Sequence, residues 1–132
     1  MNLRIPAALR EEMLACLASR LPEEGCGLLG GQGDVCSVIL PVTNELHSPT
    51  GFRMDPQEQL RAFLQFEDQG LELTAIYHSH PRGPQVPSAT DVAEFSYPGV
   101  ISLICVPLDG YWIVRGFIID GEAMTEITLI WE

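Results

Sequence analysis

Positive charge is scarce in this sequence. The chain has no lysine, and its seven basic residues stand against 18 aspartates and glutamates, which gives a formal net charge of -11 over 132 residues. A surface of this sign repels phosphate backbones and anionic lipid headgroups. Nucleic acid and membrane surfaces are therefore not expected as partners. The acidity favours a soluble protein, although a basic partner would also suit it.

Long hydrophobic runs and paired cysteines are also missing. The most apolar stretch, Val100 to Leu108, is about half of the roughly 20 residues that a membrane-spanning helix needs. Glutamates at positions 11 and 12 precede any sustained apolar run, so the order of a secretory signal is absent. The four cysteines form no CxxC pair of the kind that marks zinc knuckles. We expect a cytoplasmic protein with reduced, buried thiols.

The bulk composition is that of a folded globular protein. Hydrophobic residues make up 46% of the chain and charged residues 19%, both within the ordinary range. A chain of this length can bury a core without disulfide bonds. We therefore predict a single domain over residues 1–132, without internal repeats or a disordered linker.

Two amphipathic helices are predicted in the first half of the chain. Pro6 suits the first turn of a helix, and apolar residues recur at helical spacing from there to about Arg20. A second helix follows an N-capping signal at Asp55 and ends at Gly70. Between the two helices, the segment from Cys26 to Leu40 is typical of a β-hairpin.

Strands dominate the prediction for the second half. Residues 73–77 form an apolar run that leads directly into two histidines, and a short helix begins at Ser88. Three further apolar runs, 100–106, 111–119 and 124–131, are separated by Asp-Gly pairs, which are strong hairpin signals. These runs predict an antiparallel meander. With the helices, it indicates an α+β sandwich in which helices pack on a mixed sheet.

His78 and His80 stand at the end of the strand predicted over 73–77. Alternate side chains of an extended segment project to the same side, so both rings can face one ion while Ser79 points away. Zinc accepts imidazole nitrogen and carboxylate oxygen, and a catalytic site typically has three protein ligands. The same two rings would equally suit packing or hydrogen bonding on one face of a sheet. The pair alone does not decide between these interpretations.

Ser88 and Asp91 have the spacing of a helix capping box, which on its own is more often structural than catalytic. The two roles are compatible, because a cap at Ser88 places Asp91 in the first helical turn, pointing back toward the histidines. Prolines within 81–87 stiffen the connection and lower the entropy lost when distant ligands converge. His78, His80 and Asp91 are thus the predicted ligands of one Zn2+ ion.

A metal hydrolase commonly uses a carboxylate outside the ligand set to move the proton of the attacking water. Glu23 and Glu24 are the candidates. Two adjacent glutamates after a proline are by default a solvated acidic turn. The apolar segment that begins at Cys26 favours Glu24, because it places that residue at the mouth of a buried strand. The role of Glu23 stays open, and His47 is expected in an exposed loop.

Together these residues resemble the signature of the JAMM, or MPN-plus, zinc metalloproteases of the Mov34/MPN/PAD family. The pattern E…HSHx₇SxxD is matched at every position, from Glu24-Gly25-Cys26-Gly27 through His78-Ser79-His80-Pro81 to Ser88 and Asp91. In that family the glutamate is the general base, the histidines and the aspartate bind zinc, and the serine helps to stabilise the tetrahedral oxyanion. The resemblance implies these roles for Glu24, His78, His80, Asp91 and Ser88.

The resemblance also implies a fold and a substrate class. The family has a cytidine-deaminase-like α/β/α layout, the JAB/MPN domain, with a mixed, curved sheet flanked by helices. Its members hydrolyse an isopeptide or peptide bond, often beside the C-terminal Gly-Gly of a ubiquitin-like protein. This short chain is similar to the compact bacterial members of the family. Those members in turn resemble enzymes that process sulfur-carrier adducts. A flexible substrate tail would suit pairing with a strand edge, which the sequence does not identify.

Other functions are weaker. Amidohydrolase barrels need about 250 residues, and zinc deaminases need HxE and PCxxC motifs, which are absent. The main alternative is a non-catalytic MPN-type scaffold or a metal-binding interaction module. The complete set of ligands, base and serine favours the catalyst. The sequence does not set the oligomeric state, and a homodimer is left open.

Overall fold

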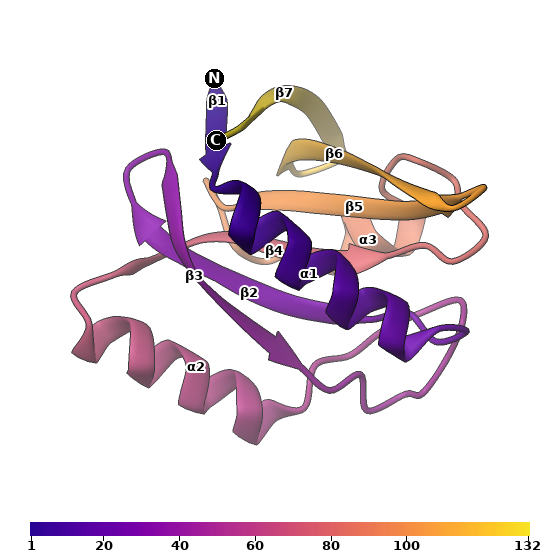
Figure 1. Cartoon of the computed structure of the whole chain (residues 1–132), viewed down its shortest axis with the longest axis horizontal. Coiled ribbons are helices and arrows are strands. Elements are labelled where there is room, and N and C mark those ends of the chain that lie inside the picture. Colours follow the sequence, from indigo (N-terminus) through magenta and orange to yellow (C-terminus); the bar gives the residue numbers. More distant parts are fainter.

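The computed structural model describes residues 1–132, and Figure 1 shows its helices packed around one mixed sheet. The elements in chain order are β1 (Asn2–Ile5), α1 (Ala7–Arg20), β2 (Cys26–Gln32), β3 (Val35–Val42), α2 (Pro56–Asp68), β4 (Glu72–Ser79), α3 (Ala89–Glu94), β5 (Ile101–Leu108), β6 (Tyr111–Asp120) and β7 (Ala123–Trp131). None of the three helices has the length and apolar character needed to cross a membrane.

Both long helices and the C-terminal meander are where the sequence predicts them. Pro6 stands immediately before α1. The Asp55 side chain accepts hydrogen bonds from the N–H groups of Gln57 and Glu58, so it caps α2 as expected. Strands β5, β6 and β7 pair antiparallel in sequence, and Gly110 has a positive φ in the first Asp-Gly turn.

The sheet is mixed, with the order β1-β3-β2-β4-β5-β6-β7, and it closes on itself. Pairs β4–β5 and β1–β7 are parallel, and β2 is antiparallel to both of its neighbours. The mixed sheet with flanking helices was predicted, but its closure was not. Closure depends on β1, which pairs with β7 over four residues and with β3 only through Arg4 and Val35.

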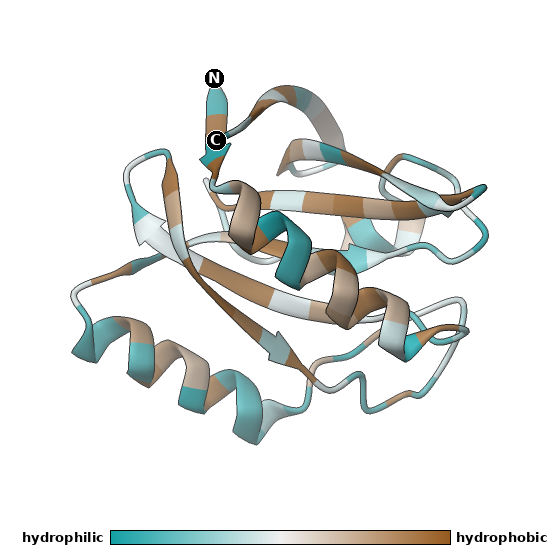
Figure 2. Cartoon of the chain, in the orientation of Figure 1, coloured by the Kyte–Doolittle hydropathy of each residue, from teal (hydrophilic) through white to brown (hydrophobic).

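The core lies on both faces of the central strands β2 and β4. Leu29 and Tyr77 point to the side covered by α1, and Leu28 and Ile76 point to the side covered by α2. Figure 2 shows hydrophobic colour along β2 and β5, whereas α2 is hydrophilic over much of its length. The two long helices therefore bury opposite faces of the strands that lead to the histidines.

Gly27 allows β2 to pass close to the ring of Tyr77 on β4. A Cβ atom at position 27 would lie 2.2 Å from Tyr77 Oη and 2.3 Å from its Cζ. The ring is fully buried, and its hydroxyl has no hydrogen-bond partner. The tyrosine therefore has no room to move away from an added methyl group.

Substituting Gly27→Ala should lower the free energy of unfolding by about 3 kcal/mol, because overpacking must displace a buried ring. Gly51→Ala is the matched control, since a Cβ atom at position 51 would lie 4.0 Å from its nearest neighbour, Leu46 Cδ1. It should change stability by less than about 0.5 kcal/mol. Urea denaturation of both variants measures the difference, and equal effects would contradict the proposed contact.

Candidate metal centre

The pairing of β2 with β4 brings two distant sequence segments together. Cys26 is opposite His78 in this ladder, so the residues just before β2 lie beside the end of β4. The backbone continues the contact beyond the strands, because the Ser79 N–H donates to the Gly25 carbonyl at 3.0 Å. Glu24 is therefore placed next to the His-Ser-His segment.

The three predicted ligand residues converge on one point. His78 Nε2 and His80 Nε2 lie 3.1 Å apart, and Asp91 Oδ2 lies 3.2 Å from the first and 3.0 Å from the second. The histidine side chains are buried, and the aspartate side chain is mostly buried. Three metal-ligating atoms thus meet within hydrogen-bond distance in a site largely shielded from solvent.

Each imidazole ring is oriented by a contact on its far side. His80 Nδ1 donates to the Pro84 carbonyl at 2.8 Å, because a carbonyl can only accept. When His80 is neutral, its Nε2 therefore carries the lone pair that faces the cluster. Burial disfavours a proton on this ring, but the contact with Asp91 outweighs burial and raises the pKa of His80. Phe52 stacks on His78, with ring centroids 4.4 Å apart. Sequence reasoning missed Phe52, since nothing in its loop marks it as a neighbour of β4.

Asp91 is both a capping residue and a neighbour of the histidines. The Ser88 N–H donates to Asp91 Oδ2 at 2.8 Å, and the Asp91 N–H donates to Ser88 Oγ at 3.0 Å. The predicted capping box is therefore present at the start of α3. The same Oδ2 atom contacts both imidazoles, so the capping role does not prevent Asp91 from facing the histidines.

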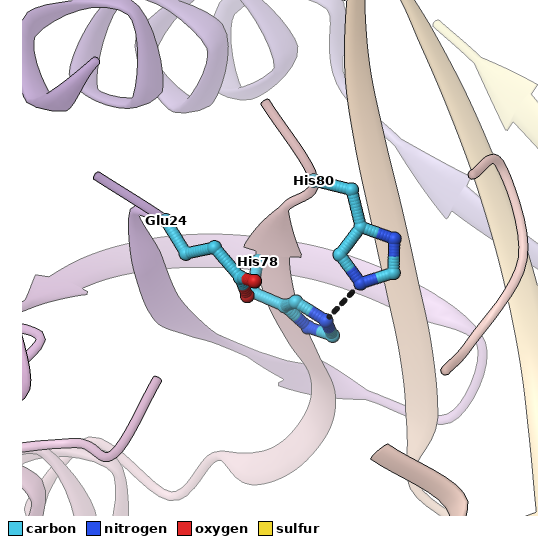
Figure 3. A group of neighbouring side chains, drawn as sticks. All are labelled: Glu24, His78 and His80. Carbon is cyan, nitrogen blue, oxygen red and sulfur yellow. Dashed lines mark hydrogen bonds between the residues drawn. The ribbon is translucent and has the colours of Figure 1, made fainter. Parts of the chain in front are cut away.

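Glu24, and not Glu23, faces the histidines. Glu24 is 5% exposed, and its ligand atom lies within 4.8 Å of those of His78 and His80. Figure 3 shows its carboxylate directed toward the two rings. The Glu23 carboxylate instead contacts His47 Nδ1 at 3.1 Å, in a pair whose imidazole is largely exposed. His47 is thus an exposed loop residue, as expected, and does not join the cluster.

Two sets of three ligand residues are consistent with these contacts. Glu24, His78 and His80 form a metal-ligating group within 4.8 Å. Asp91 is closer to both imidazoles, at 3.0 and 3.2 Å, and Glu24 Oε1 has no hydrogen-bond partner at all. Geometry therefore favours Asp91 as the third ligand and leaves Glu24 as a free buried carboxylate.

Burial and mutual contact set the charges of these groups. Burial lowers the pKa of His78, which keeps this imidazole neutral near pH 7. Burial would raise the pKa of Asp91, but hydrogen bonds with His78 and His80 outweigh it and hold the pKa well below its usual range. Burial raises the pKa of Glu24 to about 7, against the opposing effect of His80. The site thus combines a fixed anion with a carboxyl group that can exchange a proton at neutral pH.

A cavity of about 320 Å³ opens beside the cluster. His78 and Asp91 form part of its wall. Arg53 and Met54 also line it. The remaining large apolar and aromatic lining residues are Phe52, Ile76, Phe95 and Tyr97. A partly apolar cavity that reaches the ligand atoms is a typical small-molecule or peptide site.

The family model described as prokaryotic homologues of the JAB domain matches residues 6–120. The chain belongs to this family. The predicted resemblance is therefore confirmed, and with it the JAB-type fold.

Named relatives match nearly the whole chain. A probable TtuB-protein conjugate cleaving protease of Thermus thermophilus is 38% identical over 129 residues, covering 96% of this chain and 83% of that protein. The CysO-cysteine peptidase of Mycobacterium tuberculosis is 39% identical over 125 residues, covering 92% and 86%. A solved structure, protein DSY2949 from Desulfitobacterium hafniense, has a TM-score of 0.89 at 34% identity and covers 100% and 93% of the two chains.

The raised pKa of Glu24 predicts how stability depends on pH after the protein is treated with a chelator. Between its ordinary value of 4.5 and about 7, the folded chain keeps a proton that the unfolded chain has lost. This stabilisation is complete below pH 4.5 and is lost as pH rises through 7. The unfolding free energy of wild type relative to Glu24→Gln should therefore fall over this range, by no more than about 3 kcal/mol.

Urea denaturation of both proteins from pH 4.5 to 8 measures this difference. The shifted histidines and Asp91 are present in both proteins, so subtracting the two curves leaves the effect of Glu24 together with its interactions with His80 and Asp91. A difference that stays constant with pH would contradict the buried, unpaired carboxyl group.

Proposed function

We propose that this chain is a zinc-dependent metallohydrolase that cleaves an isopeptide or peptide bond at the C-terminal end of a ubiquitin-like or sulfur-carrier protein. The observation that carries the proposal is the convergence of His78, His80 and Asp91 within 3.2 Å, beside the buried carboxylate of Glu24. The relatives named as a conjugate cleaving protease and a CysO-cysteine peptidase support the substrate class. We assign the activity to a single domain spanning residues 1–132.

The donor atoms fit a zinc ion. Bonds of about 2.0–2.1 Å in tetrahedral coordination place ligand atoms roughly 3.3 Å apart, close to the 3.0–3.2 Å separations here. Two imidazole nitrogens and a carboxylate oxygen at such distances need a shared cation or proton between them. His78 is neutral, and the neutral form of His80 presents the lone pair of Nε2. A cation would take the place of the proton that Asp91 favours on His80. We propose one Zn2+ per chain, held by His78, His80 and Asp91.

Glu24 is the proposed general base. A zinc ion held by His78, His80 and Asp91 would supply Lewis acidity, the property that polarises a carbonyl group and acidifies water. Glu24 Oε1 has no hydrogen-bond partner, so it is free to accept the proton of the attacking water. The same carboxyl group then delivers that proton to the leaving amine, a task helped by a pKa raised toward neutrality.

Ser88 is proposed to stabilise the oxyanion. Its Oγ accepts a hydrogen bond from the Asp91 N–H, which fixes the position of the hydroxyl group at the start of α3. The hydroxyl proton is not used in that bond, so it remains available to a developing negative charge. A donor fixed in advance costs little reorganisation during the reaction.

The arrangement of the helices on the sheet and the unpaired cysteines are also consistent with this activity. Helices α1 and α2 cover opposite faces of β2 and β4, which supports the cytidine-deaminase-like α/β/α layout. The four cysteines are unpaired, which suits the reducing cytoplasm. The alternative of a non-catalytic scaffold gains no support from the site, because the ligand set, the base and the serine are all brought together.

Glu24→Gln should separate metal binding from catalysis. The substrates are a ubiquitin-like sulfur carrier with a C-terminal cysteine adduct and the same carrier joined to a lysine side chain. Wild type should hold one zinc and cleave at least one of them. Glu24→Gln should keep the zinc but lose about 10³-fold in kcat, because the proton acceptor is gone. Glu23→Gln makes the same chemical change one residue earlier and should leave both properties intact.

Zinc content by metal analysis and initial cleavage rates check this prediction. Loss of zinc from Glu24→Gln would show that the glutamate is a ligand. Wild-type protein that holds zinc but cleaves neither carrier would reject the substrate class and leave the metal site standing.

Variants of the ligand residues should lose the metal itself. His80→Ala and Asp91→Asn should each reduce zinc below half an ion per chain and abolish cleavage, because three ligands become two. His47→Ala removes an exposed imidazole and should retain zinc. If Asp91→Asn keeps zinc while Glu24→Gln loses it, the ligand set is Glu24, His78 and His80 instead. Metal analysis after gel filtration distinguishes the two sets.

A further inference from the structure

The peptide unit between Glu24 and Gly25 is held at both of its polar ends by side chains. The Glu24 carbonyl accepts a hydrogen bond from Asn44 Nδ2 at 3.0 Å. The Gly25 N–H donates to Ser79 Oγ at 2.9 Å. Asn44 is 4% exposed and Ser79 is fully buried. Two buried polar side chains from different elements thus meet on one peptide.

Asn44 uses its full hydrogen-bonding capacity. Its Nδ2 donates to the carbonyls of Glu24 and Gly51, both at 3.0 Å. Its Oδ1 accepts from the N–H groups of Leu46 and Arg53, both at 3.1 Å. All four partners are backbone groups of fixed polarity, so the orientation of the amide is determined. Asn44 therefore ties the start of β2 to the loop formed by residues 44–54.

The loop contacts the site at two further points. The Glu24 N–H donates to the Ser48 carbonyl at 2.9 Å, so both backbone polar groups of Glu24 bond to this loop or its asparagine. Phe52, from the same loop, stacks on His78. Displacement of the loop would therefore move the glutamate backbone and one histidine contact together.

Helix α1 packs against the Glu24–Gly25 peptide. A Cβ atom at Gly25 would lie 2.7 Å from Leu17 Cδ2, and Leu17 is 1% exposed. The backbone therefore cannot shift toward α1 without displacing a core side chain. Because Glu24 Oε1 makes no hydrogen bond of its own, the position of the carboxylate depends on this backbone.

We propose that Asn44 and Ser79 are positioning residues that clamp the Glu24–Gly25 peptide and so hold the Glu24 carboxylate at the reaction centre. This inference rests on the proposed role of Glu24 as the base. The clamp matters because a displacement of about 1 Å in a catalytic group can cost about 100-fold in rate. Neither residue lines the cavity beside the cluster or belongs to the group of candidate metal ligands, so their effect is transmitted through Glu24.

Kinetics of Ser79→Ala and Asn44→Asp test the catalytic consequence. Ser79→Ala removes the acceptor for the Gly25 N–H. Asn44→Asp keeps the shape and the acceptor but replaces the amide group that donates to the Glu24 and Gly51 carbonyls. Each variant should hold one zinc and keep KM within about twofold, while kcat falls about 10- to 100-fold. Asp55→Ala controls for general loss of stability and should keep kcat, because the Asp55 side chain hydrogen-bonds only to the N–H groups of Gln57 and Glu58 at the start of α2.

Amide hydrogen exchange of the chelator-treated chain tests the clamp without any cleavage. The Gly25 N–H should exchange at least tenfold faster in Ser79→Ala than in wild type, while the amides of β2 beyond Cys26 keep their rates. Unchanged exchange at Gly25 would overturn the clamp. Faster exchange with unchanged kcat, or loss of zinc from Ser79→Ala, would overturn the positioning of the base. A wild-type chain that cleaves no carrier would reject the proposed function, and the positioning role with it, but the exchange result would still decide the clamp.

Discussion

The register between β2 and β4 is the constraint on which the site depends. Cys26 opposite His78 brings the end of β4 to the start of β2, and the proximity of Glu24 to the histidines follows from that alignment. A slip of one residue would turn the histidine side chains to the opposite face of the sheet. Leu28 and Leu29 resist such a slip, because they fill the cores under α2 and α1 respectively. The hydrophobic core therefore fixes the geometry of the polar site.

The site is polar but sits among buried groups, and this combination sets its chemistry. A buried carboxyl group takes up a proton more readily than one in water, whereas a carboxylate in contact with two imidazoles stays ionised. Glu24 and Asp91 have the same functional group and differ only in these surroundings. The separate roles proposed for them thus depend mainly on where the fold places two carboxyl groups of similar ordinary pKa.

Local signals account for what the sequence predicts well. Pro6, the cap at Asp55 and the Asp-Gly turns each act over a few residues, and α1, α2 and the meander follow them. Strand β1 was not predicted, because a strand of four residues is too short to show a periodic hydrophobic pattern. The closure of the sheet depends on β1, so it was not predicted either. Asn44 looks like any loop asparagine, since its importance comes from a partner 20 residues away.

The candidate site could likewise be predicted only where the sequence itself carries a signal. His78, His80 and Asp91 were recognisable because their types and spacing match a known signature, and the structure brings them together. The choice between Glu23 and Glu24 needed the fold, since adjacent residues differ in exposure only after β2 is placed. Phe52 had no signal in the sequence, because stacking on His78 joins residues from separate elements.

The scarcity of positive charge has a chemical meaning beyond net charge. All seven basic residues are arginines, so residues 1–132 present no ε-amino group. A guanidinium group stays protonated at any physiological pH and does not act as the amine nucleophile in forming an isopeptide bond. A chain proposed to remove small proteins from amine groups therefore offers, within residues 1–132, no lysine to which such a protein could be attached.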